Sequence, residues 1–576
     1  MLSYRNLAMC VLGRPLHTGG GIDSPRPASQ RAAAFILTAA MLTTLAAPAF
    51  AGTWYIEDGD ITVKAGETEG TNKVSQGANQ EVEDTDTIIK NREDTASSNT
   101  VTINAEDKND KVEVTLKDVN IDTSSRNKAA VSVTGSGNTT IKLDGDNHLT
   151  GGNGIYSNSS GSLTISGDEN DSLTAQGGDS RNGIYSVSGD VTISGGTVTA
   201  TGGNSTGSYG SGGDGIHSGS LTISGGTVTA TGGGSTGSNG LGGRGIRSSS
   251  GGVTISGGTV KAAGGNGSDG GSGISSSSGV TVSDGTVTAN GGNGGNVSGD
   301  GIRSDGGVTI SGGTVNAAGG DSKDGYGGDG IRSGGGVTIS GNTVNAAGGN
   351  GGKVGGYGIC SFDRVAISGG TVEAAGGSSG SSNGGSGIYS NDIDLSGSLE
   401  LTAKAGSPNG KALSQKGSEL VLDTIKDKLG PGAKVTATDA DGKVIDQVPI
   451  PRPVEPEGPV IPEESSSSSG GGSAAPSAPV SPLPGLTVTD KDGQRISYTS
   501  TQSGNALTVC VGRLTASFRI SLAALRQLRA EGIEAITFQT ILCSTTLSVD
   551  ELLAMGGEDA EAVLTHRLTD SSLTVG

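Results

Sequence analysis

Short segments that alternate apolar and polar residues recur along the middle of the chain. A Gly-Ile-x-Ser motif opens each repeat, and segments such as Val-Thr-Ile and Thr-Val-Thr-Ala follow it. Alternation with β-branched residues is typical of half-buried strands, and the intervening Ser-Gly-Gly is typical of turns. Each repeat is therefore predicted to contain three short strands. The isoleucines that mark the repeats are Ile155, Ile184, Ile216, Ile246, Ile274, Ile302, Ile331, Ile359 and Ile388.

These strands are predicted to build a right-handed parallel β-helix over residues 101–450. Bends rather than hairpins join the segments, so each strand pairs in parallel with its copy in the next coil. Stacking then aligns the marker isoleucines in one interior column. A coil on its own buries too little apolar surface to fold, so neighbouring coils stabilise one another and residues 52–100 are expected to form an N-terminal cap. A second interior column is predicted from Val191, Leu221, Val253, Val280, Val308 and Val337.

All the length variation of the repeats falls in one glycine-rich loop, such as TGGNSTGSYGSGGDG. Glycine loses the most conformational entropy on ordering and offers no side chain to pack. We therefore expect these loops to be the mobile part of each coil.

The two ends of the chain differ from the repeats. Residues 1–51 combine arginines with an apolar run that ends in AFA, which is typical of a cleaved signal peptide. The protein is therefore expected to be secreted or to lie at the cell surface. Residues 451–485 are rich in Pro, Ser and Gly and are predicted to be a disordered linker.

Residues 486–576 are expected to form a small α+β domain. The segment ISLAALRQLRAEG reads as a helix with Leu522, Leu525 and Leu528 on one face. Ser548 and Glu551 have the spacing of a capping box that opens a second helix, and alternating segments flank both helices.

The composition limits which side chains can fill the core and which partners the protein can bind. Among 576 residues there are 107 Gly but only 5 Phe and 1 Trp, so the core must be narrow and aliphatic. The net charge of −20 repels nucleic acid and anionic lipid, and no apolar run after residue 51 is long enough to cross a bilayer. Of the four cysteines, Cys510 and Cys543 are compatible with a disulfide or with two buried thiols.

The amino-acid sequences of the repeats resemble those of a known protein family. The segments VEVTLKDVNI, TTIKLDGDNHLTGGNGIYS and GIYSVSGDVTISGGTVTATGG resemble a bacterial carbohydrate-binding domain family. That family is built as a right-handed β-helix and is related in fold to pectate lyases. The resemblance covers roughly residues 100–447 and is strongest over 112–203. It implies binding of plant cell-wall polysaccharides, either cellulose-like or polygalacturonate, together with calcium.

The residue between Ile and Ser of each motif is predicted to point outward. Aromatic rings there can stack on sugar faces, and arginine can hold a uronate carboxylate through two hydrogen bonds. The alternative is a solvated face with no ligand. The candidate carbohydrate-binding residues are Tyr156, Tyr185, His217, Arg247, Arg303, Arg332 and Tyr389, and Ser275 and Cys360 complete this column.

A second column precedes the Gly-Ile pair. Asp329 is expected to lie directly above Asp300, so that two carboxylates could share a calcium ion. The favoured alternative is an Asp in a turn that hydrogen-bonds its own backbone, so calcium is possible but not required. The other members of this column are Asn153, Asn182, Asp214, Arg244, Ser272 and Tyr357.

These features favour a secreted, non-catalytic protein that binds acidic or β-linked polysaccharide along its faces. An adhesin-like stalk without a glycan ligand is the first alternative, because a long solenoid followed by a linker would hold the last domain away from the cell. A polysaccharide lyase or hydrolase is the second, although the paired Asp-Asp, Gly-His and Arg-x-Lys motifs of polygalacturonases are missing. An ice-binding stack fits less well, because Lys261, Asn316 and Glu373 interrupt the outward threonines.

Overall fold

The structure is a computed structural model, and it divides the chain into two compact units between residues 456 and 457. It describes residues 51–450, 485–489, 495–496, 498–503, 505–511, 516–540, 544–555, 560–566 and 571–575. The predicted linker, apart from residue 485, and the predicted signal peptide, apart from residue 51, lie outside the described residues.

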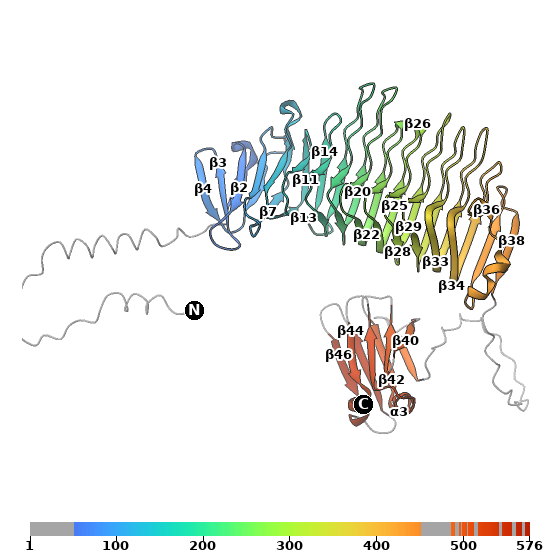
Figure 1. Cartoon of the computed structure of the whole chain (residues 1–576). Helices are drawn as coiled ribbons and strands as arrows, with labels where there is room; N and C mark the ends of the chain where they lie inside the picture. The colour runs from blue at the N-terminus through green and yellow to red at the C-terminus, as the bar shows by residue number, and fades with distance from the viewer. Residues whose placement is uncertain are drawn as a thin grey trace, which may run out of the picture. The chain divides into compact units, whose positions relative to one another are not determined.

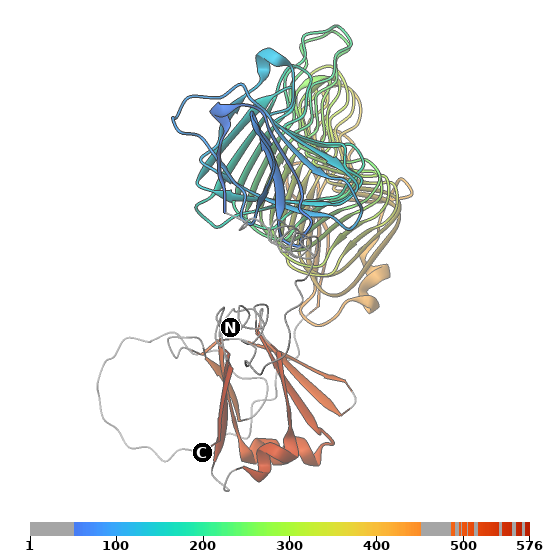
Figure 2. The same ribbon diagram turned by 90° about the vertical axis from the view of Figure 1, so that its left-hand side faces the viewer.

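The first unit is the predicted parallel β-helix (Figure 1). Each coil contributes one strand to each of three faces, and on every face the strands of successive coils pair in parallel and in register. Figure 2 looks along the stack from the N-terminal coils, so that the strands of successive coils follow one another into the page.

The first face contains the Gly-Ile-x-Ser strands. Its strands are β2 (Ile61–Ala65), β6 (Val101–Ala105), β9 (Val131–Gly135), β12 (Ile155–Ser157), β15 (Ile184–Ser186), β18 (Ile216–Ser218), β21 (Ile246–Ser248), β24 (Ile274–Ser276), β27 (Ile302–Ser304), β30 (Ile331–Ser333), the first parts of β33 (Ile359–Ala375) and β34 (Ile388–Lys404), and β35 (Leu413–Gln415).

The second and third faces follow in each coil. The second is formed by β1 (Thr53–Tyr55), β5 (Ile88–Lys90), β7 (Lys111–Lys117), β10 (Asn138–Asp144), β13 (Leu163–Ser166), β16 (Val191–Ile193), β19 (Leu221–Ile223), the first parts of β22 (Val253–Ala263) and β25 (Val280–Asn290), β28 (Val308–Ile310), β31 (Val337–Ile339), and the middle of β33 and β34. The third is formed by β8 (Asn120–Asp122), β11 (Asp146–Gly151), β14 (Ser172–Gly177), β17 (Thr197–Thr201), β20 (Thr227–Thr231), the last parts of β22 and β25, β29 (Thr314–Ala318), β32 (Thr343–Ala347), the last parts of β33 and β34, and β37 (Lys434–Thr438).

The interior columns are those that the sequence predicts. All nine marker isoleucines are fully buried, and the second column from Val191 to Val337 is at most 1% exposed. The core of this unit is aliphatic throughout, which agrees with the scarcity of Phe and Trp. The serine of each motif is also buried, and hydroxyls such as those of Ser186 and Ser248 donate to carbonyls of the following turn.

Antiparallel strands close both ends of the stack. At the N-terminal end β3 (Asn72–Gln76) pairs antiparallel with β2 and with β4 (Asn79–Asp84). Stacking itself begins at β1 and β2, inside the range where the sequence predicts only a cap. At the C-terminal end β38 (Val444–Pro449) pairs antiparallel with β37, and β36 (Ser418–Glu419) pairs with β35. The 3-10 helices are η1 (Ile56–Asp58), η2 (Ser124–Arg126) and η3 (Leu422–Lys428).

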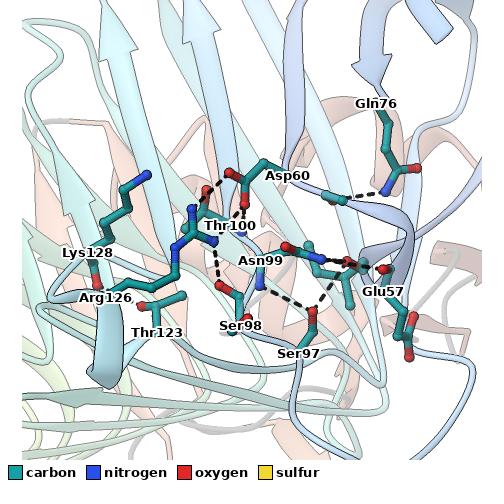
Figure 3. A network of polar contacts seen from close by, with 12 residues as sticks. Glu57, Asp60, Gln76, Ser97, Ser98, Asn99, Thr100, Thr123, Arg126 and Lys128 are labelled. Atoms are coloured by element: carbon teal, nitrogen blue, oxygen red, sulfur yellow. Dashed lines mark hydrogen bonds and ion pairs between the residues drawn. The ribbon is translucent and has the colours of Figure 1, made fainter. Parts of the chain in front are cut away.

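A polar network ties the first coils together (Figure 3). Both guanidinium Nη atoms of Arg126 donate to the Asp60 carboxylate at 3.0 Å, and Nη1 also donates to the Ser98 carbonyl at 2.7 Å. The hydrogen bond from Arg126 lowers the pKa of Asp60 below its ordinary value. The amide of Asn99 donates to the Ile56 carbonyl. Side-chain contacts thus replace part of the regular stacking where the coils are least alike.

The glycine-rich loops stack in register from coil to coil rather than standing free, and their predicted mobility stays a prediction. They project beyond the strands on one side of the solenoid, and we call this projection the fin (residues 202–213 and their equivalents in later coils) (Figure 1). Two fin segments, β23 (Gly267–Asp269) and β26 (Gly294–Val297), form a parallel pair of their own.

The two legs of each fin loop are joined through glycines. The Gly213 amide donates to the Gly203 carbonyl, Gly233 to Gly213 and Gly243 to Gly233, each at 2.8 Å, and the zigzag continues to Gly406. A Cβ added at Gly233 would lie 2.0 Å from the Gly203 oxygen. Glycine is therefore required because the backbones approach so closely, and the hydrogen bonds between coils order the loops.

Within its described residues, the second unit contains two four-stranded sheets and two helices. The sheets are β39 (Leu486–Thr489), β42 (Ala516–Ser521), β45 (Glu561–His566) and β46 (Ser571–Val575), and β40 (Thr499–Ser503), β41 (Ala506–Cys510), β43 (Ala535–Gln539) and β44 (Ser544–Ser548). The helices are α3 (Leu522–Ala530) and α4 (Val549–Ala554). Leu522, Leu525 and Leu528 are buried on α3 as predicted, and the Ser548 hydroxyl accepts from the Glu551 amide at the start of α4.

Candidate functional site: a groove along the first face

The outward column of the first face is in register from coil to coil. Tyr156 pairs with Tyr185, Tyr185 with His217, and the pairing continues through Arg247, Ser275, Arg303, Arg332, Cys360 and Tyr389. The ring centroids of Tyr156 and Tyr185 are 5.7 Å apart, and those of Tyr185 and His217 are 4.9 Å apart. The column thus begins as a ladder of three rings and continues as a row that contains three arginines.

A second column, the one before the Gly-Ile pair, forms a hydrogen-bonded ladder. The Oδ1 atom of Asn153 accepts from the Asn182 amide N–H at 2.9 Å, and that of Asn182 accepts from Asp214 at 2.6 Å. Asp214, Asp300 and Asp329 accept from the next coil in the same way. Each side chain therefore satisfies a backbone donor one coil further along, which explains the preference for Asn and Asp at this place.

A third column lies on the fin and was not recognised from the sequence. Its members are bridged from one coil to the next at Ser211, Leu241, Asp269 and Val297. Leu241 and Val297 are 45% and 46% exposed, so this column presents two apolar side chains beside the polar Ser211 and Asp269. These residues stand at one fixed offset before each marker isoleucine, and that offset is the signal that could have revealed them.

The three columns line a continuous groove. One part of it, with a volume of about 720 Å³, is lined by the outward column from Tyr185 to Arg303, by the ladder from Asn153 to Asp300, and by the fin column. A second part of about 510 Å³ extends toward the N-terminal coils and contains Tyr156, Lys128 and Thr100. Asn153, Arg181 and Tyr185 line both parts, so the two are adjoining stretches of one groove.

Most of the predicted carbohydrate-binding residues line this groove. Tyr156, Tyr185, His217, Arg247 and Arg303 do so. Sequence reasoning did not single out Arg181, which lies three residues before a marker isoleucine and also lines the groove.

The last members of the column form a separate cluster outside this groove. The rings of Tyr389 and Tyr357 are stacked, with centroids 4.9 Å apart and planes 20° from parallel. The guanidinium of Arg332 lies over the exposed ring of Phe362 at 5.2 Å. Cys360 keeps the register of the outward column between Arg332 and Tyr389, but it is fully buried there, and burial raises the pKa of its thiol.

Asp300 and Asp329 stack as predicted, and each takes part in the backbone ladder. The Asp300 Oδ1 atom accepts from the Asp329 amide at 2.8 Å, and the Asp329 Oδ1 atom accepts from the Tyr357 amide at 2.7 Å. The expected hydrogen bond of an Asp to its own turn is thus replaced by one to the next coil. Arg332 Nη1 lies 3.1 Å from the Asp329 Oδ2 atom.

Burial is the largest cause of the pKa shifts of Asp300 and Asp329. It raises the pKa of both carboxyls, and together with the charge of Asp300 it raises the pKa of Asp329 to about 7. Among the described residues, no group of three or more His, Cys, Asp or Glu side chains is placed to hold a metal ion. A calcium ion here would depend on these two carboxylates and on backbone or solvent oxygens.

The sequence also predicts a possible disulfide between Cys510 and Cys543 and no membrane-spanning segment after residue 51. The Cys510 sulfur lies 3.5 Å from Gln539 Oε1, and Cys543 lies outside the described residues, so the disulfide between the two cysteines stays a prediction. In the ranges that the structure describes, no helix is long and apolar enough to cross a membrane.

Comparison with known proteins adds to the fold rather than to the site. A family model described as Beta helix repeat matches residues 221–243, 253–278 and 308–331. No curated protein and no solved structure matches the chain. The first two matched segments contribute residues to the groove, and all three lie in stacked coils, so the repeat match and the stacked strands agree that this part of the chain is a parallel β-helix.

Proposed function

We propose that the protein is a secreted, non-catalytic carbohydrate-binding protein that holds an extended polysaccharide in the groove along its first face. The support for this proposal is one observation: equivalent side chains of successive coils line a single continuous groove. A polymer with a repeated unit matches a surface with a repeated rung, because successive units meet side chains at equivalent positions of successive coils.

The spacing and chemistry of the groove fit a sugar chain. Coils in a parallel stack repeat about every 4.8 Å, which is comparable to the length of one sugar unit in an extended polymer. The rings of Tyr156, Tyr185 and His217 can stack on the apolar faces of sugars. The ladder amides and the arginines can bind hydroxyl and carboxylate groups. Calcium is an optional part of this proposal and is tested by chelation.

The experiment is retention of the purified protein on immobilised neutral and acidic polysaccharides, with and without chelator. Replacing Tyr156 and Tyr185 together by Ser removes two rings, and the coil before them already carries Ser132 in this column. The double variant should bind about tenfold or more weakly, because each stacking contact contributes roughly 0.5–1.5 kcal/mol. Its melting temperature should stay close to that of the wild type.

The matched control is Tyr209→Ser, which removes a tyrosine that is 81% exposed on the fin and does not line the groove. This variant should bind like the wild type. If the wild-type protein is retained on no polysaccharide, the proposal is wrong and the adhesin-like stalk takes its place. If reducing ends or unsaturated uronates accumulate during binding, the protein is a hydrolase or a lyase instead.

A further inference from the structure

The groove changes its chemistry along its length. Its N-terminal stretch presents the three rings of Tyr156, Tyr185 and His217. The next coils present Arg244, Arg247 and Arg303. The repeat itself does not require arginine at these positions, because the next coil has Ser272 and Ser275 in place of Arg244 and Arg247.

The carboxylates of the arginine stretch are largely committed to the protein. Asp214 and Asp300 have side chains only 8% and 9% exposed, and each gives its Oδ1 atom to the backbone ladder. The Asp214 Oδ2 atom lies 3.2 Å from His217 Nδ1 and 3.8 Å from Arg247 Nη1. Arg303 Nη1 is 4.0 Å from Asp300 Oδ2.

Among the three arginines, Arg244 is the one whose positive charge is least balanced by nearby carboxylates. It is partly buried, and its guanidinium makes no hydrogen bond or ion pair within the part of the chain that the structure describes. Burial lowers its pKa, Asp214 opposes this effect, and the positive charges of Arg247 and Arg303 add to it. A partly desolvated cation beside two like charges is unfavourable until an anion binds.

The remaining carboxylate of this stretch is Asp269, which lines the groove from the fin. This part of the groove is lined by four guanidiniums, those of Arg181, Arg244, Arg247 and Arg303, and by three carboxylates, those of Asp214, Asp269 and Asp300. In a chain with a net charge of −20, this excess of one positive charge in the groove is a local reversal of sign.

We propose that the groove consists of two successive subsites. The ring ladder binds neutral faces of sugar units, and the strip formed by Arg244, Arg247 and Arg303 selects units that carry an anionic group, either carboxylate or sulfate. This inference rests on the proposed function and adds which part of the groove sets the preference for charge. Arg244 is the main determinant, since its guanidinium makes no hydrogen bond or ion pair with the described residues.

The test compares three hexasaccharides: a neutral β-linked glucan, a uronate and a sulfated glycan. Titration calorimetry of the full chain measures their binding at low and high salt. The variant is Arg244→Ser with Arg247→Ser, which copies the residues of the following coil and so suits the fold. It should bind the anionic probes about tenfold or more weakly, because charge-assisted hydrogen bonds are lost, and with less dependence on salt. Its affinity for the neutral probe should stay within about twofold of the wild type.

Two control variants separate charge selection from other effects. Arg364→Ser removes an exposed arginine that pairs with Asp392 and Asp394 outside the groove, and it should change nothing. Tyr185→Ser should weaken neutral and anionic probes alike and leave the salt dependence intact. The stronger of the two anionic probes identifies the charged group.

The inference is overturned if the double arginine variant binds the anionic probes as tightly as the wild type, or if it weakens all three probes equally. The proposed function fails in a different way, since the wild-type protein would then bind none of the three.

Discussion

At the scale of single residues, the position before the Gly-Ile pair accepts a backbone hydrogen bond from the next coil, whether it is Asn or Asp, but only Asp can also titrate. Asn153 and Asn182 satisfy the next backbone N–H as neutral groups, whereas Asp300 and Asp329 do the same as acids that are almost fully buried. Burial therefore places a carboxyl with a pKa of about 7 inside a ladder that needs only an acceptor.

Asp329→Asn tests this effect. The folded state raises the pKa of Asp329 from 3.8 to about 7, so its contribution to stability is fully present below pH 3.8 and is lost as the pH rises through about 7. The amide can still accept from the Tyr357 N–H, as Asn153 and Asn182 accept from their neighbours. The variant should gain melting temperature relative to the wild type between pH 4 and pH 8. A difference that is constant over this range would contradict the assignment.

At the scale of elements, the fin is ordered by backbone contact rather than by side chains. Each leg of a loop lies against the other leg and against the loop of the next coil, with amide-to-carbonyl hydrogen bonds in both directions. This arrangement needs no apolar side chain inside the fin, and it gives the groove a firm second wall.

Gly233→Ala should disrupt the fin, because the added methyl would lie 2.0 Å from a carbonyl oxygen. We expect a loss of about 1–3 kcal/mol in the free energy of unfolding, as for other overpacked sites. Gly207→Ala is the control, since its Cβ would meet nothing closer than 3.6 Å. Urea unfolding of both variants decides the point, and equal midpoints would show that the fin tolerates side chains.

At the scale of the whole β-helix, each coil is held by its two neighbours. Ile302 pairs with Ile331 and Val308 with Val337, so residues 302–330 form one complete coil. Stability in such a stack is approximately a sum of coil and interface contributions.

Deleting residues 302–330 should therefore leave a folded β-helix that is shorter by one rung, because Gly301 then precedes Ile331 just as Gly330 does now. The maximum dimension from X-ray scattering should fall by about 5 Å, with strand content per residue unchanged. Aggregation or loss of strand signal would show that the coils are not interchangeable.

Much of this protein was determined by its sequence alone. Strand alternation and a repeat with constant spacing between Gly-Ile-x-Ser and the next two segments specify the coil, the two interior columns and the order of the outward column from Tyr156 to Tyr389. These features are local, because the side of a strand on which a residue lies depends only on its position along that strand.

The tertiary structure decided what lies beside the column. The fin brings Leu241, Asp269 and Val297 next to residues of the first face, and only that proximity turns a row of side chains into a groove. It also decided that Cys360 is buried and that the Arg244 guanidinium makes no hydrogen bond or ion pair with the described residues. Such facts depend on contacts between segments that are far apart along the chain, and the glycine-rich fin carries no hydrophobic pattern, so the order of residues along one strand does not reveal them.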